Sequence, residues 1–71
     1  MYGMTSLQNA SAFGHNKTIE LLLTKNASIN IKDNHGNTAL DFAKMENQDF
    51  TILLLRKHGG KTGEELKPDG N

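Results

Sequence analysis

The sequence contains no cysteine and no tryptophan, and it has a single proline and a single tyrosine among 71 residues. Without cysteine the chain has neither a disulfide scaffold nor thiol chemistry, which suits the reducing cytoplasm where we expect the protein to be. The longest purely apolar run, residues 52–55, is far shorter than the roughly 20 residues that span a membrane. The sequence therefore predicts neither a disulfide-stapled domain nor a membrane segment.

The sequence also lacks runs of residues with the same charge. Eight Lys and Arg residues balance eight Asp and Glu residues, spread along the chain. Proteins that bind nucleic acid or anionic membranes need a concentrated basic surface. We therefore expect neither nucleic acid nor a membrane as a partner.

Patterns of catalytic and metal-binding residues are absent from the sequence. His15, His35 and His58 are too far apart for ligands on one helix, and no cysteine accompanies them. No serine has a histidine and an acid at an interpretable spacing, and no glycine-rich phosphate loop follows a strand. We predict no catalytic residue, metal, cofactor or small-molecule substrate, and hence no enzyme.

Two stretches of the chain repeat each other, because residues 5–27 align without gaps on residues 38–60 at an offset of 33. A period of this length indicates stacked supersecondary units. The matched pairs are Thr5 and Thr38, Leu7 and Leu40, Ala10 and Ala43, Thr18 and Thr51, Ile19 and Ile52, Leu21 and Leu54, and Leu22 and Leu55.

Each unit predicts two helices. Thr5 with Gln8, and Thr38 with Asp41, have the spacing of a capping box, so a helix should begin at each threonine. Gly14 and its counterpart Asn47 tolerate the left-handed conformation that ends a helix.

The second helix of each unit follows that stop. Ile19, Leu22 and Leu23, like Ile52 and Leu55, have the spacing of a buried apolar stripe. We expect this helix to end near Asn26 in the first unit and near Gly59 in the second.

The 33-residue unit, with its T-x-L-x-x-A opening, its leucine run and the Gly14-His15 pair, resembles the ankyrin repeat over residues 2–60. The resemblance implies an all-α helical solenoid with two helix-turn-helix repeats, joined by a β-hairpin finger around Asp33–Gly36. It also implies that the His15 ring caps a helix start. We expect a repeat pair in residues 1–60, with repeat one at 2–32 and repeat two at 33–60.

The last residues, 61–71, are predicted to form a C-terminal cap and tail. Thr62 and Glu65 again have capping-box spacing, so we expect one helical turn that Pro68 ends. Leu53 stands where the first unit has the polar Glu20. We expect either Leu66 or a partner chain to cover Leu53.

The resemblance implies a non-catalytic module for protein–protein interaction. The family's recognition surface, the finger and the first-helix face, corresponds here to Tyr2, Met4, Ala12, Phe13, Lys32, Asn34, His35, Asn37, Met45 and Glu46. The alternative is a structural role, in which the same exposed faces form a homo-oligomer and no foreign partner exists.

Two repeats are fewer than the three or more that a stable array normally needs. The chain is therefore expected either to assemble with copies of itself or to be the end of a longer ankyrin array. Asn9 occupies the place of the apolar Phe42, which favours a first repeat with no repeat before it.

Overall fold

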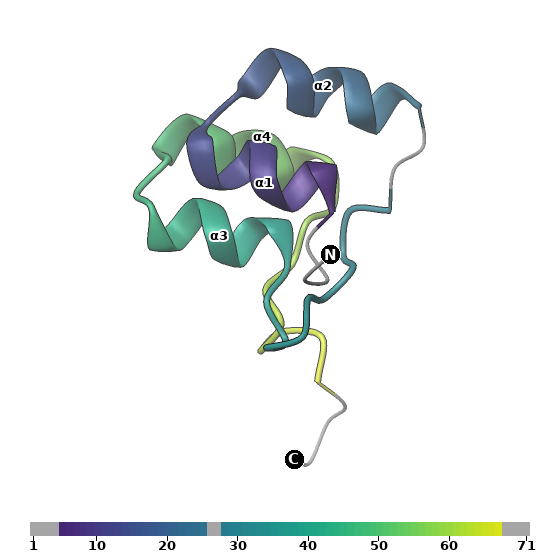
Figure 1. The fold of residues 1–71 in the computed structure, drawn as a ribbon, viewed down its shortest axis with the longest axis vertical. Helices are drawn as coiled ribbons and strands as arrows, with labels where there is room; N and C mark the ends of the chain where they lie inside the picture. Colours follow the sequence, from purple (N-terminus) through teal and green to yellow (C-terminus); the bar gives the residue numbers. More distant parts are fainter. Residues whose placement is uncertain (1–4, 26–27, 68–71) are drawn as a thin grey trace.

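The computed structural model describes residues 5–25 and 28–67. These residues form four helices, α1 (Ser6–Phe13), α2 (Asn16–Thr24), α3 (Ala39–Met45) and α4 (Asp49–Lys57), and no β-strand. The α1–α2 pair stacks on the α3–α4 pair, so that α1 contacts α3 and α2 contacts α4 (Figure 1). The predicted all-α repeat pair is thus confirmed.

Both predicted capping boxes are formed. The Thr5 hydroxyl accepts the Gln8 N–H at 3.0 Å, and the Gln8 side chain accepts the Thr5 N–H at 2.8 Å. In the second repeat the Thr38 N–H donates to Asp41 Oδ2 at 2.9 Å, and the Asp41 N–H donates to the Thr38 hydroxyl. These paired bonds satisfy N–H groups that have no partner within the helix, which is why α1 and α3 begin where they do.

The ends of the first helices also match the prediction. Gly14 has φ 69° and Asn47 has φ 57°, so both residues are left-handed. Asn47 is the sole non-glycine residue with positive φ in the described part of the chain. Gly59 also has a positive φ after α4, whereas Asn26 lies outside the described residues.

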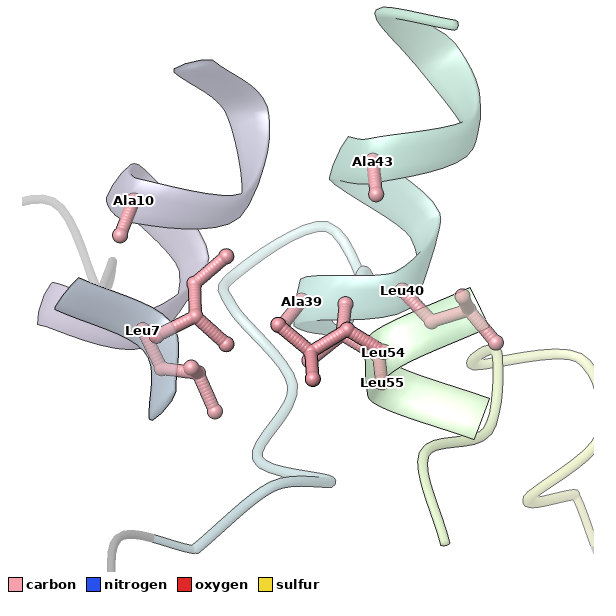
Figure 2. Close-up of a cluster of buried hydrophobic side chains, with 8 residues drawn as sticks. Leu7, Ala10, Ala39, Leu40, Ala43, Leu54 and Leu55 are labelled. Atoms are coloured by element: carbon pink, nitrogen blue, oxygen red, sulfur yellow. The ribbon is translucent and has the colours of Figure 1, made fainter. Parts of the chain in front are cut away.

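The core lies between the two pairs of helices (Figure 2). Every helix contributes to it, and Ile19 and Leu55 are completely buried. Leu22 and Ile52 are only half-buried and pack against its margin, so the predicted stripe is less uniform than the repeat suggested. The buried apolar residues are Leu7, Ala10, Ile19, Ala39, Leu40, Ala43, Leu54 and Leu55.

One expectation about helix starts is wrong. His15 precedes α2, but its ring makes no capping hydrogen bond. At the counterpart position, the Gln48 side chain donates to the Ala12 carbonyl of the preceding repeat at 3.1 Å. The Gln48 side chain is thus directed toward the preceding repeat, whereas the His15 ring lies beside the Phe13 ring of its own repeat.

The segment after α4 forms the predicted turn. The Glu65 N–H donates to the Thr62 hydroxyl at 3.1 Å, and the Thr62 N–H donates to Glu65 Oε1 at 3.0 Å. The Leu66 N–H then donates to the Thr62 carbonyl at 3.2 Å. Pro68 lies outside the described residues.

This turn docks on the start of α3, beside the segment that joins the repeats. The Gly63 N–H donates to Asp41 Oδ2 at 2.7 Å, and the Thr38 hydroxyl donates to the Lys61 carbonyl. A Cβ at Gly63 would lie 1.9 Å from the Gly36 carbonyl oxygen, so only glycine permits this approach. Leu53 remains 68% exposed, so the expectation that Leu66 covers it is wrong.

An ion pair ties the turn to α4 and makes its docking depend on pH. Arg56 Nη1 lies 2.7 Å from Glu65 Oε1, and Nη2 lies 2.9 Å from Oε2. Arg56 first, and then the Thr62 N–H, lowers the pKa of Glu65 from its ordinary 4.5 to about 2. The folded chain therefore favours the carboxylate.

We expect this contribution to stability to be complete above pH 4.5 and lost as the pH falls toward about 2. Because other carboxyl groups titrate in the same range, the measurement compares urea unfolding of the wild type and Glu65→Gln across it. The difference between the two proteins should shrink as the pH falls. A constant difference would show that the ion pair contributes nothing to folding.

Candidate protein-binding surface

The segment between the repeats is closed by one aspartate. Asp33 Oδ1 accepts the N–H groups of His35 and Asn37, each at 2.9 Å, and the Asp33 N–H donates to the Asn37 carbonyl at 2.8 Å. Gly36, with φ 82°, completes the turn by donating to the Asp33 carbonyl. The structure shows a turn here and no paired strands among the described residues, so the β-hairpin of the predicted finger is not seen.

The Asp33 carboxylate is held in its charged form by this turn. The Asn37 N–H, followed by the smaller effects of the His35 N–H and ring, lowers the pKa of Asp33. A carboxylate that accepts two backbone N–H groups fixes a loop without help from strand pairing. The turn is therefore closed at its base by hydrogen bonds to one carboxylate.

The tip of this turn carries three of the predicted binding residues. Lys32, Asn34 and His35 are all exposed. Asn37 is half-buried at the base, where its backbone bonds to Asp33, so it shapes the turn more than it faces a partner.

The remaining predicted residues lie at the far ends of the first helices. Phe13 at the end of α1 is 65% exposed, and Met45 at the end of α3 is 54% exposed. Glu46 follows Met45 and is exposed, whereas Ala12 is half-buried and its carbonyl accepts from Gln48. The Phe13 ring lies 5.9 Å from the His15 ring, centroid to centroid.

The predicted surface thus consists of two parts. The turn lies at the start of α3 and the Phe13 and Met45 group at its end, and a helix of seven residues separates them by about 10 Å (Figure 1). The turn part carries polar side chains, and the other part carries the apolar Phe13 and Met45. Tyr2 and Met4, which were predicted to extend the surface, lie outside the described residues.

Gln8 holds the turn in place, a role that the sequence prediction missed. Its buried amide donates to the carbonyls of Ile31 at 2.7 Å and Asn37 at 3.2 Å. The counterpart Asp41 has no proton to donate and accepts from Gly63 instead. Gln8 was predicted only as part of a capping box, and its distant partners leave no signal in local spacing.

The described part of the chain, residues 5–25 and 28–67, brings no three His, Asp or Glu side chains together in a way that would hold a metal ion. Nor does it contain a helix with the length and apolar character needed to cross a bilayer.

Comparison with known proteins agrees with this geometry. A family model described as ankyrin repeats (three copies) matches residues 2–65. The chain is also similar to the human transient receptor potential cation channel subfamily A member 1, with 37% identity over 69 residues, or 97% of the chain. The chain spans only 6% of the length of that relative.

Proposed function

The chain belongs to the ankyrin repeat family, and we propose that it is a non-catalytic module that binds another protein. Ankyrin repeats generally mediate protein–protein interaction. The proposed contact surface comprises the turn at residues 32–37 and the ends of α1 and α3. The observation that carries this proposal is the exposure of Phe13 and Met45 at the ends of α1 and α3, at the opposite end of α3 from the turn that Asp33 closes.

Large apolar side chains of this kind supply most of the energy of protein interfaces, since aromatic anchors lose little entropy on binding and methionine adapts its shape. Phe13 and Met45 lie outside the core, so evolution can change them at little cost to the fold. Lys32, in the segment before α3, and Glu46, which follows α3, provide charges of opposite sign. Such charges contribute more to the orientation and association rate of a partner than to its affinity.

The same proposal assigns residues 2–32 and 33–60 to the two repeats and 61–71 to a C-terminal cap. Its support is the docking of Gly63 on Asp41 and Gly36, which covers the start of the second repeat.

A photo-crosslinking amino acid at Phe13 tests the surface, and the same amino acid at Phe50 is the matched control. The two phenylalanines have nearly equal exposure, 65% and 63%, but Phe50 lies on α4. In the source cell we expect specific protein adducts from position 13 and few from position 50. Adducts mainly from position 50 would contradict the proposed surface.

The charge-reversal pair Lys32→Glu and Glu46→Lys should weaken capture of that partner at least several-fold, since both exposed charges lie on the proposed surface. The melting temperature should change little, because exposed substitutions usually cost within about 0.5 kcal/mol. Reversal of Lys17 on α2 and Lys57 on α4 is the control. Capture that survives the first pair but fails in the control would place the contact on the second helices.

A further inference from the structure

On one side of the stack, residues of the second repeat are buried and their counterparts in the first repeat are exposed. In the second repeat Thr51 is 1% exposed and Leu54 is 8% exposed, because the first repeat lies against them. Their counterparts Thr18 and Leu21 are exposed, and Leu21 has 58% of its surface open. We call the side of repeat one formed by His15, Thr18 and Leu21 the leading face.

On the opposite side of the stack, residues of the first repeat are buried and their counterparts in the second repeat are more exposed. Ser11 and Ile19 of the first repeat are completely buried where the second repeat covers them. Their counterparts Lys44 and Ile52 are exposed and half-buried. We call the side of repeat two formed by Lys44, Asp49, Ile52 and the Met45 carbonyl the trailing face.

Two hydrogen bonds made by residues at the start of α4 and on it show which polar groups meet between the helices of the two repeats. The Thr51 hydroxyl donates to Asn16 Oδ1, and the Gln48 amide donates to the Ala12 carbonyl. Both donors come from the second repeat and both acceptors from the first.

The open faces carry the same donors and acceptors at matched positions. Thr18 and His15, on the leading face, correspond to the two donors. Asp49 and the Met45 carbonyl, on the trailing face, correspond to the two acceptors. An aspartate carboxylate accepts a hydroxyl proton at least as well as an asparagine oxygen does. A trailing face therefore complements a leading face in both apolar and polar groups.

Besides Asp49, the contact would cover the charged Lys44, at the position where Ser11 is buried in the first repeat. A lysine stem lies along apolar surface while its ammonium group reaches water, so the charge is compatible with contact at the margin.

We propose that the leading face of one chain binds the trailing face of a second copy, in continuation of the stacking seen within the chain. The two faces are different surfaces, so the contact is head to tail and leaves one free face of each kind on every dimer. Association then continues beyond two copies. This contact adjoins the proposed partner surface, because Met45 contributes its carbonyl to the trailing face and the His15 ring of the leading face lies 5.9 Å from the Phe13 ring.

Sedimentation equilibrium of the full chain over a wide concentration range tests the proposal. The mass of the wild type should rise with concentration past that of a dimer. Leu21→Glu blocks the leading face with a charge, and Asp49→Arg blocks the trailing face with a bulky cation opposite Thr18. Each variant alone should be monomeric, because every contact needs one face of each kind.

An equal mixture of the two variants should form dimers and nothing larger, since one intact leading face and one intact trailing face remain. Leu53→Glu is the matched control, because Leu53 is as exposed as Leu21 and its counterpart Glu20 faces solvent in the covered repeat. This control should assemble as the wild type does. Circular dichroism of each variant verifies that the helices are intact.

Three results would overturn the proposal. A wild-type monomer at every concentration would leave the leading face to another occupant, such as a preceding repeat of a longer chain. A blocked variant that still dimerises alone would show a two-fold contact. Loss of assembly in Leu53→Glu, with assembly retained in Leu21→Glu, would place the contact on the outer side of α4.

Discussion

Leu55→Ala should lower the free energy of unfolding by about 2–5 kcal/mol, the usual cost of emptying a buried leucine site. Leu55 has no exposed surface and lies in the core with Ile19 and Leu40. A chain of this size buries only about 60% of its unfolded surface, so little stability remains to absorb such a loss. We expect the variant to be largely unfolded, as measured by circular dichroism in a urea titration.

Leu22→Ala provides the matched control for this result. Leu22 occupies the same position of the repeat but is half-buried, because no helix covers it on the leading side. Its truncation should cost clearly less, since less apolar surface returns to water. Equal losses at Leu22 and Leu55 would mean that the two repeats are covered alike, contrary to the structure.

Gln8→Glu should destabilise the fold at neutral pH by several kcal/mol, although the two side chains have nearly the same shape. The Gln8 amide donates to the Ile31 and Asn37 carbonyls. A carboxylate cannot donate, so the variant buries a charge against two carbonyl oxygens and leaves both without this partner. Urea unfolding at neutral pH measures the loss.

The same variant should recover stability in acid. Burial and the facing carbonyls raise the folded-state pKa of the new carboxyl group above its unfolded value, since they disfavour the charged form. The protonated acid can donate one hydrogen bond, so the loss relative to wild type should shrink as the pH falls through that raised pKa. A loss that is absent at neutral pH would show that the Gln8 amide does not hold the turn.

The helices could be predicted because their signals are local. Thr5 with Gln8, Thr38 with Asp41, and the left-handed Gly14 and Asn47 fix where α1 and α3 begin and end. Each of these signals depends on residues within about one turn of a helix. Each also occurs in both repeats, at the offset of 33 residues. The burial of a residue, in contrast, could not be inferred from that of its counterpart in the other repeat. Leu21 and Leu54 are the same residue at the same position, yet only Leu54 has a neighbouring repeat against it.

The candidate site was predicted only in part for the same reason. The exposed positions of Lys32, His35 and Met45 follow from their places in the repeat. The turn at Asp33–Gly36 was predicted from its residue types, and the Asp33 carboxylate closes it. The paired strands expected on either side of it are not seen among the described residues. The docking of Gly63 against Gly36 joins residues distant in sequence, and no local pattern indicates it.

The hydrogen bonds of Gln8 bear on how such a chain lengthens by duplication. All the groups that Gln8 joins lie between Thr5 and Asn37, a stretch whose length equals the 33-residue period. A duplicated segment 5–37 inserted after Asn37 would bring its own means of fixing its loop. A duplicate of the second repeat would carry Asp41, which accepts the Gly63 N–H but cannot donate to loop carbonyls. Duplication of residues 5–37 should therefore extend this array more readily, in evolution or in design, than duplication of the second repeat.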